Sequence, residues 1–437
     1  MRNGTSVTSI GSPERAFVLH PYAKQGHVGQ RTAEACLEEV VGLARAISLD
    51  VRLAEAVPIV RPRPATYFGT GTVESLGHMI EADEVGVTVF DGPLSPVQQR
   101  NLERAWKCKV IDRTGLILEI FGERARTKEG SLQVELAHLS YQRSRLVRSW
   151  THLERQRGGF GFLGGPGETQ IEADRRLIDE RIVRIRRELE KVVRTRGLHR
   201  TARRRVPYPV VALVGYTNAG KSTLFNRLAN AGVYAEDQLF ATLDPTMRAV
   251  RLPSGRRFIL SDTVGFVSSL PTTLVAAFRA TLEEVLEADV VVHVRDISHP
   301  DAEAQKTDVL GVLGELGMEE LRLAAMIEVR NKIDRLDAQA RARQVERALH
   351  EPDTAALSAV TGEGVSTLLD LIEHRINATR RVLDIDVPLT DGATLAWLYR
   401  KGEVLSRRDD ESLAHLQVGL DAADAARFEH RAAAAST

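Results

Sequence analysis

The chain has 437 residues, of which 43% are hydrophobic, and its 59 Lys and Arg balance 59 Asp and Glu. This length exceeds what one hydrophobic core supports and favours two or three domains. Two cysteines, Cys36 and Cys108, exclude a disulfide framework and a cysteine zinc site. Because the apolar runs are short, we expect no signal peptide, no membrane span and a cytoplasmic location.

Residues 1–130 alternate between short apolar runs and helix-like stretches. The runs AFVLH, VRLAEAV, VGVTVF and KVIDR alternate with stretches centred near Leu37, Leu76, Leu102 and Ile117. Such alternation predicts β-α units around a parallel sheet, and we expect an N-terminal α/β subdomain that binds nucleic acid or the ribosome. The sequence GTGTVESL from Gly69 lacks the third glycine of GxGxxG, which favours a tight turn over a second nucleotide site.

Residues 131–207 are expected to form a basic, antiparallel helical hairpin. In two stretches, mostly apolar residues recur every three or four positions and so form a seam along one helix face. The first seam consists of Leu132, Leu136, Leu139, Arg143, Leu146, Trp150 and Leu153, and the second of Ile178, Ile182, Ile185, Leu189 and Val192. Two such seams pack as an antiparallel coiled pair. Six glycines and a proline within residues 158–167 cannot continue a helix, so residues 158–170 form the predicted turn.

The hairpin is strongly basic. Residues 141–205 hold 18 Lys and Arg against 8 Asp and Glu, and local charge decides whether a surface attracts phosphate. Unpaired bases stack on aromatic rings and are held by arginine, so we expect RNA contacts from Phe160, Phe162, Arg155 and Arg157. Charge and periodicity alone equally allow a solvated arginine face, with both phenylalanines folded back to cap the seam.

The remaining sequence divides into two further parts after the basic stretch RRRVPYP. Strand, loop and helix patterns repeat through residues 208–380, which predicts a second α/β domain. The mixed pattern of residues 381–437 predicts a small α+β domain that ends in the low-complexity tail AAAAST. The expected fold class is therefore a multidomain α/β protein.

A phosphate-binding loop opens the second α/β domain. The stretch GYTNAGKS fits the pattern G-x-x-x-x-G-K-[ST] between an apolar strand and a helix, where backbone N–H groups at a helix N-terminus collect an anion. We expect Lys221 to reach the β- and γ-phosphates and Ser222 to offer its hydroxyl to Mg²⁺. The predicted residues are Gly215, Tyr216, Thr217, Asn218, Ala219, Gly220, Lys221, Ser222 and Thr223.

Two more motifs complete the metal and γ-phosphate side. FATLD lies between the first helix and the second strand of this domain, where a threonine closes over the metal, and DTVG follows the apolar run FIL. The expected catalytic set is Lys221, Thr242 and Gly265, and the expected metal ligands are Ser222 and Thr242. The two motifs comprise Phe240, Ala241, Thr242, Leu243, Asp244, Asp262, Thr263, Val264 and Gly265.

The last two motifs select the base. NKID resembles the guanine motif of small GTP-binding proteins, in which an aspartate accepts hydrogen bonds from the guanine N1 and amino groups. SAV resembles the motif whose backbone supports the guanine carbonyl oxygen. The residues concerned are Asn331, Lys332, Ile333, Asp334, Ser358, Ala359 and Val360. Five motifs in this order predict a Ras-like GTPase domain that binds GTP and GDP.

Residues 15 to about 405 resemble HflX, a family of ribosome-associated GTPases. The resemblance is carried by GYTNAGKSTLFN, QLFATLDPT, SDTVGFVSSLP and GGFGFLGGPGETQIEADRR. It implies binding to the large ribosomal subunit and its rRNA, with the hairpin reaching toward the peptidyl transferase centre. It also implies that the GTP-bound protein separates stalled ribosomes into subunits. We expect the protein to be a monomer.

The position after DTVG affects the expected rate. Many GTPases use a glutamine there to orient the attacking water, but this chain has Phe266, which cannot hydrogen-bond water. We therefore predict slow intrinsic hydrolysis that a partner accelerates, unless another loop residue positions the water. Asn218 matches an asparagine that holds K⁺ in cation-stimulated GTPases, although asparagine is also a common turn residue.

Two other functions fit the same motifs. A GTPase that assists assembly of the large subunit would need the same nucleotide site and the same basic hairpin. A nucleotide-gated protein that binds or remodels RNA would need ATP at the N-terminal subdomain, which the incomplete glycine pattern at Gly69 supports poorly.

Overall fold

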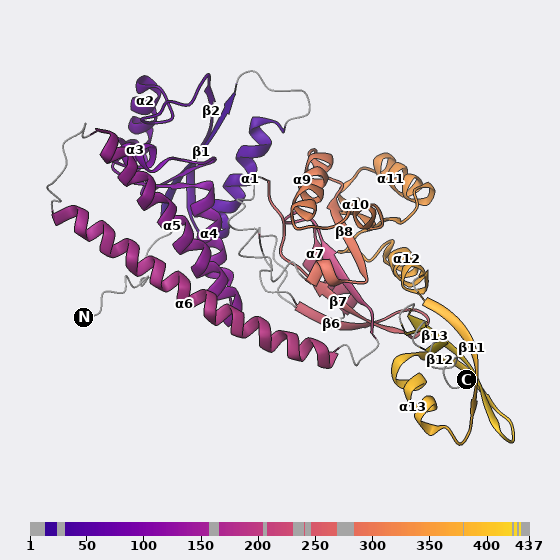
Figure 1. The fold of residues 1–437 in the computed structure, drawn as a ribbon. Helices are drawn as coiled ribbons and strands as arrows, with labels where there is room; N and C mark the ends of the chain where they lie inside the picture. The colour runs from indigo at the N-terminus through magenta and orange to yellow at the C-terminus, as the bar shows by residue number, and fades with distance from the viewer. Residues whose placement is uncertain are drawn as a thin grey trace.

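The computed structural model describes residues 14–23, 31–156, 166–203, 208–229, 240, 246–268, 284–378, 380–421, 424–425 and 428–429. Within these ranges, side chains are described except at residues 146–156, 166–171, 193–203, 380–381 and 421. This part of the chain contains three sheets with their accompanying helices and a pair of long helices (Figure 1). The expected multidomain α/β fold class is confirmed.

The N-terminal unit contains a parallel sheet with the strand order β2-β1-β3-β4. Its elements are β1 (Arg15–Ala23), α1 (Ala33–Ala46), β2 (Asp50–Ile59), α2 (Thr70–Ala82), β3 (Val87–Phe90), α3 (Pro96–Trp106), β4 (Lys109–Asp112) and α4 (Arg113–Arg124). Each predicted strand and helix is therefore present. Alternate residues of β1 enter two cores, because Val18 packs with Leu43 and Phe121 while Phe17 packs with Ile80 and Leu102. Helices thus cover both faces of the sheet.

Helix α2 corrects one prediction. The Gly69 segment was expected to be a tight turn, but Gly69 is the N-cap of α2 and the helix continues from Thr70. A Cβ added at Gly71 would have no neighbour within 4 Å. No packing requirement therefore explains the glycine at this position, and Gly69 lies at the N-cap, where glycine is well tolerated.

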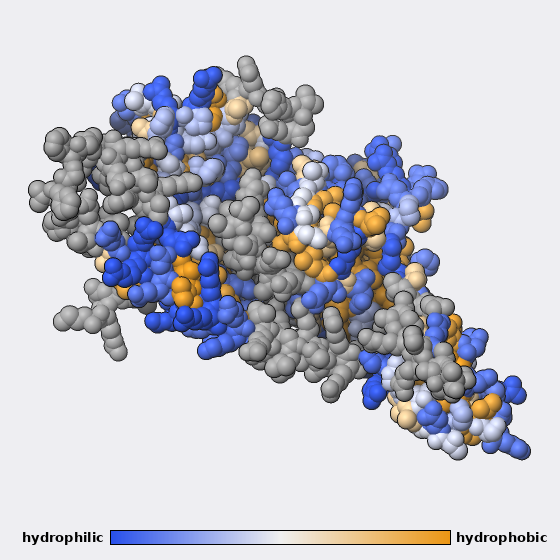
Figure 2. Space-filling model, in the orientation of Figure 1, coloured by the Kyte–Doolittle hydropathy of each residue, from blue (hydrophilic) through white to orange (hydrophobic). Residues whose placement is uncertain are grey.

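Helices α5 (Lys128–Gln156) and α6 (Pro166–Arg203) contact each other as the two arms of a hairpin (Figure 1). Leu132 of α5 and Ile182 and Ile185 of α6 are buried, as their positions in the predicted seams require. Arg181 donates two hydrogen bonds, of 2.7 and 2.8 Å, to the carboxylate of Glu135 on the other arm. Hydrophilic side chains dominate the face of this region seen in Figure 2.

The central unit is a six-stranded sheet with the order β10-β9-β8-β5-β7-β6, in which only β6 is antiparallel to its neighbour. Its elements are β5 (Val210–Val214), α7 (Lys221–Ala229), β6 (Thr246–Arg251), β7 (Arg257–Asp262), β8 (Val290–Asp296), α9 (Ala302–Glu315), α10 (Glu320–Ala324), β9 (Ile327–Asn331), the 3₁₀ helix η1 (Ile333–Arg335), α11 (Ala338–His350), β10 (Thr354–Ala356) and α12 (Val365–Ala378). Parallel strands place the nucleotide motifs together, since β5, β7 and β9 all end at one edge of the sheet.

The C-terminal unit contains an antiparallel sheet in the order β11-β13-β12 and the helix α13. Its elements are β11 (Arg380–Pro388), α13 (Gly392–Lys401), β12 (Glu403–Asp409) and β13 (Leu413–Asp421). Leu398 of α13 packs on Leu416 and Val418 in a separate small core. Throughout the described residues, no helix is long and apolar enough to cross a membrane.

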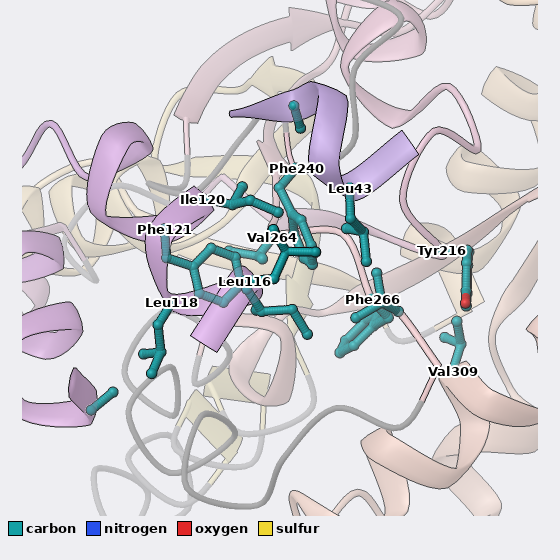
Figure 3. Close-up of a cluster of buried hydrophobic side chains, with 14 of the residues drawn as sticks. Leu43, Leu116, Leu118, Ile120, Phe121, Tyr216, Phe240, Val264, Phe266 and Val309 are labelled. Atoms are coloured by element: carbon teal, nitrogen blue, oxygen red, sulfur yellow. The ribbon is translucent and has the colours of Figure 1, made fainter. Parts of the chain in front are cut away.

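One hydrophobic core joins the N-terminal and central units. Leu43 and Phe121 come from α1 and α4, whereas Phe240 belongs to the FATLD motif and Phe266 directly follows DTVG (Figure 3). The rings of Phe121 and Phe240 meet edge to face with centroids 4.7 Å apart. The N-terminal unit therefore packs directly on the loops that surround the nucleotide site.

Candidate functional site

The phosphate loop connects β5 to α7, and two of its residues must be glycine. Gly215 has a φ of +150°, and a Cβ there would lie 2.1 Å from the carbonyl oxygen of Val294. Gly220 has a φ of +92°, and a Cβ there would lie 2.3 Å from Nδ2 of Asn331. Both positions have positive φ, and a side chain would collide with backbone at Gly215 and with the Asn331 side chain at Gly220, so the sequence pattern has a direct steric cause.

Lys221 lies under the phosphate loop. Its Nζ donates hydrogen bonds to the carbonyl oxygens of Gly215 (3.1 Å) and Tyr216 (2.8 Å), and the residue is 6% exposed. Burial lowers the pKa of Lys221 to about 8, although the negative charge of Asp262 acts in the opposite direction. A desolvated ammonium at the start of a helix is suited to bind phosphate oxygens, whose charge would stabilise its protonated form.

The residues expected near Mg²⁺ supply oxygen atoms. Ser222 donates a hydrogen bond of 2.7 Å to the carboxylate of Asp262, which is fully buried at the end of β7. The described residues contain no cluster of three or more His, Cys, Asp or Glu that could hold a metal. The Ser222 hydroxyl and the Asp262 carboxylate fit Mg²⁺, because that ion takes hard oxygen ligands and is bound largely through phosphates and water. Ser222 would ligate it, with Asp262 orienting the hydroxyl.

Asn331 links the guanine motifs to the phosphate loop. Its Nδ2 donates to the carbonyl oxygen of Ala219 at 2.8 Å, and its Oδ1 accepts the N–H of Ala359 at 3.0 Å. Lys332 adopts a φ of +65° and places its Nζ 2.8 Å from Asp296. Asp334 is exposed in η1, so its carboxylate is open to a base approaching from solvent.

An arginine that the sequence did not single out supports the last motif. Arg227 of α7 donates from Nε to the carbonyl oxygen of Ala359 at 2.9 Å and also hydrogen-bonds the carbonyl of Val360. Ser358 is buried, whereas Val360 is 65% exposed. In the sequence, only its place about one helical turn beyond the phosphate loop pointed to a role for Arg227. The carbonyl groups that it binds are 132 and 133 residues away, so the sequence pattern could not identify them.

The DTVG segment lies close against the phosphate loop. Thr263 Oγ1 donates to the carbonyl oxygen of Leu213 at 2.6 Å. A Cβ at Gly265 would lie 2.7 Å from Thr217 Cγ2 and 3.2 Å from Lys221 Nζ. The backbone of Phe266 forms a bridge with Tyr216 of the phosphate loop. Phe266 is 2% exposed, and its side chain lies in the core between the N-terminal and central units (Figure 3).

The side chains of two predicted residues face the N-terminal unit, and other predicted residues are outside the described part. Phe240 packs on Phe121, and Tyr216 points toward the N-terminal unit, where its hydroxyl donates to Glu39 at 2.5 Å. The hairpin residues Phe160, Phe162 and Arg157 are outside the described residues, as are Ala241, Thr242, Leu243 and Asp244. Arg155 lies in α5, but its side chain is not described.

Four family models match successive parts of the chain. They are GTP-binding GTPase N-terminal (residues 34–122), GTP-binding GTPase Middle Region (124–203), 50S ribosome-binding GTPase (210–332) and HflX C-terminal domain (343–436). GTPase HflX of Magnetococcus marinus is 51% identical over 418 residues, which cover 96% of this chain and 95% of that protein. GTPase HflX of Escherichia coli is 42% identical over 413 residues, or 94% of each chain. Among solved structures, a GTP-binding protein from Sulfolobus solfataricus in complex with GDP is 23% identical, with a TM-score of 0.45 over 83% of this chain and 98% of that one.

Proposed function

This chain belongs to the HflX family of GTPases, and we propose that it hydrolyses GTP on the large ribosomal subunit and, while bound to GTP, splits stalled ribosomes under stress. The observation that carries the nucleotide part is Asn331, whose amide joins the phosphate loop to both guanine motifs. The ribosomal part is supported by the match of residues 210–332 to a 50S ribosome-binding GTPase model. Such a protein would act in the cytoplasm, and we propose that it acts as a monomer.

The proposed chemistry depends on charge and position. Lys221 binds β- and γ-phosphate oxygens, Thr242 closes over the γ-phosphate, and the Gly265 N–H faces it. Mg²⁺, when bound through Ser222, neutralises phosphate charge. Phe266 can donate no hydrogen bond from its side chain, and its ring is buried in the core between the units. Hydrolysis by the protein alone should therefore be slow until the ribosome supplies or orders a group that positions water.

The proposed ribosomal contact is the tip of the hairpin. Helix α6 has 38 residues, which at 1.5 Å per residue gives an arm about 57 Å long. Residues 166–170, which were expected in the turn, belong to this helix. An arm of this length can carry the turn that precedes it well beyond the GTPase unit. There Phe160 and Phe162 would stack on unpaired rRNA bases, with Arg155 and Arg157 holding the backbone.

A monovalent cation is proposed as a second cofactor. Asn218 is exposed in the phosphate loop and adopts a φ of +59°, whereas Thr217 and Ala219 on either side of it are buried. We propose that its carbonyl oxygen holds K⁺ beside the phosphates, where the cation offsets developing charge. Equal rates of GTP hydrolysis in potassium and sodium buffers would contradict this proposal.

Sedimentation of ribosomes tests the splitting function. Mature ribosomes incubated with the protein and a non-hydrolysable GTP analogue should fall into subunits, whereas GDP should leave them intact. A Lys221→Ala variant serves as the control for nucleotide dependence. Intact mature ribosomes, together with binding to immature large subunits, would instead favour the alternative role in subunit assembly.

A further inference from the structure

A buried polar cluster joins the N-terminal unit to the loops of the nucleotide site. We propose that Glu39 of α1 is a positioning residue that holds the segment Gly265–Ser268 against the phosphate loop and so favours GDP over GTP. This inference rests on the proposed GTP-binding function and adds its regulation by the N-terminal unit. Glu39 is 177 residues from Tyr216 and 229 from Ser268 in sequence, so no motif indicates this role.

The carboxylate of Glu39 receives hydrogen bonds from both nucleotide loops. Its Oε2 accepts from the Tyr216 hydroxyl at 2.5 Å, and its Oε1 accepts from Ser268 Oγ at 2.9 Å. The backbone N–H of Ser268 in turn donates to the Tyr216 hydroxyl at 2.7 Å. Glu39 therefore contacts both the phosphate loop and the segment after DTVG. Arg113 supports the same contact by donating to the carbonyl oxygen of Ser268 at 3.0 Å, and Arg31 donates to the Tyr216 hydroxyl at 3.2 Å.

Two arginines keep Glu39 ionised. Arg31 donates to Glu39 at 2.5 Å and Arg113 also donates to it, and the Glu39 side chain is 6% exposed. Burial acts to raise the pKa of Glu39, but Arg113 and Arg31 together lower it. Hydrogen bonds to an ionised acceptor are about twice as strong as neutral ones, and more so when buried. The cluster is therefore a firm attachment rather than a solvated contact.

The attachment opposes entry of a γ-phosphate. A Cβ at Gly265 would lie 2.9 Å from Thr217 Cα and 3.2 Å from Lys221 Nζ, so a γ-phosphate beside Lys221 requires Gly265 to move away. Two backbone hydrogen bonds resist that movement, from Thr217 N–H to the Phe266 carbonyl (2.7 Å) and from Phe266 N–H to the Gly215 carbonyl (3.1 Å). Ser268, three residues beyond Gly265, is held by Glu39, so the same movement strains that contact too.

GDP has no γ-phosphate and does not require this movement. Weakening the Glu39 contact should therefore tighten binding of a GTP analogue more than binding of GDP. The ratio of the two affinities is the readout, because a merely structural role for Glu39 would change both affinities together.

The test is equilibrium titration of the full-length protein with fluorescent GDP and with a fluorescent non-hydrolysable GTP analogue. In Glu39→Gln and in Tyr216→Phe, the affinity for the GTP analogue relative to GDP should rise about three- to tenfold. The double variant should show less than the sum of the two single changes, since both remove the hydrogen bond between Tyr216 and Glu39. The matched control is Glu328→Gln, which removes a carboxylate bound by Arg295 and Lys306 within the GTPase unit and should leave the ratio unchanged.

The outcomes separate this inference from the proposed function. An unchanged ratio in Tyr216→Phe, or parallel loss of both affinities in Glu39→Gln with a normal unfolding midpoint, would overturn the role of Glu39. If Glu39→Gln lowers the stability of the protein, the affinity ratio of Tyr216→Phe alone tests the role of Glu39, because this variant keeps the ring and removes only the hydroxyl. Failure of the unsubstituted protein to bind either nucleotide would instead overturn the proposed function itself.

Discussion

The side-chain amide of Asn331 donates a 2.8 Å hydrogen bond to the carbonyl oxygen of Ala219 in the phosphate loop, 112 residues earlier. The same amide accepts the N–H of Ala359 at 3.0 Å, and Asn331 is only 1% exposed. One asparagine therefore keeps the phosphate and guanine sides of the site in register.

Replacing Asn331 with alanine should destabilise the GTPase unit and weaken GDP binding. The substitution leaves the carbonyl of Ala219 and the N–H of Ala359 buried without this partner, and each such group costs about 1–3 kcal/mol. Urea unfolding should show a loss of roughly 2–4 kcal/mol in the free energy of unfolding. Asn101→Ala removes one exposed hydrogen bond to Ala65 and should stay within about 0.5 kcal/mol. Equal losses in the two variants would be inconsistent with this role.

Asp334→Asn should change which base is bound. The substitution replaces an acceptor with an amide that can donate, so guanine loses hydrogen bonds to a charged group, each worth about 1.5–3 kcal/mol. GDP should bind roughly 100-fold more weakly, whereas xanthosine diphosphate, with a carbonyl in place of the amino group, should gain affinity. Asp337→Asn, which keeps an N-cap on α11, is the control. If both variants bind GDP like the unsubstituted protein, Asp334 does not read the base.

Lys221 should make stability depend on pH above about 8. Its folded-state pKa is lowered to about 8 by burial, against 10.5 for an ordinary lysine. Between these values the unfolded chain binds the additional proton, so the free energy of unfolding should rise with pH in that window when no nucleotide is added. Saturating Mg²⁺ and GDP should reduce the rise, because phosphate charge keeps Lys221 protonated. Urea unfolding at several pH values measures this rise in the free energy of unfolding. An equal rise in Lys221→Met would contradict its assignment to Lys221.

The hairpin tip should contribute to ribosome binding but not to nucleotide binding. Replacing Phe160 and Phe162 with alanine should weaken binding to the large subunit by about 1–3 kcal/mol for each base that stacks. GDP affinity should not change. Leu177→Ala, at a 64% exposed position of α6, controls for a general loss of apolar surface on the hairpin. Subunit binding that survives the double substitution would mean that the phenylalanines pack against the hairpin.

The elements and the nucleotide motifs follow from local sequence patterns. Gly215 and Gly220 are predictable because their positive φ and lack of space for a side chain belong to the motif itself. The sheet of the N-terminal unit is predictable because buried parallel strands leave apolar runs separated by amphipathic helices. Gly69 was misplaced because the start of a helix and a tight turn both accept glycine.

The links between units do not follow from such patterns. Tyr216 was predicted as part of the phosphate loop, and nothing in the sequence indicated that its hydroxyl would reach Glu39 of the N-terminal unit. Arg227 supports carbonyl groups that are 132 and 133 residues away. Phe266 was recognised as an unusual residue, yet only the packing of two units explains its burial. A single sequence does not state which distant residues will meet, so contacts of this kind had to come from the three-dimensional structure.

GTP turnover by the purified protein, with and without large ribosomal subunits at fixed salt, tests the central claim most directly. Because Phe266 is buried and cannot orient water, we predict slow turnover by the protein alone and a large increase on adding the subunits. Fast turnover by the protein alone that the subunits leave unchanged would contradict the claim, since it would mean that the chain positions the catalytic water itself.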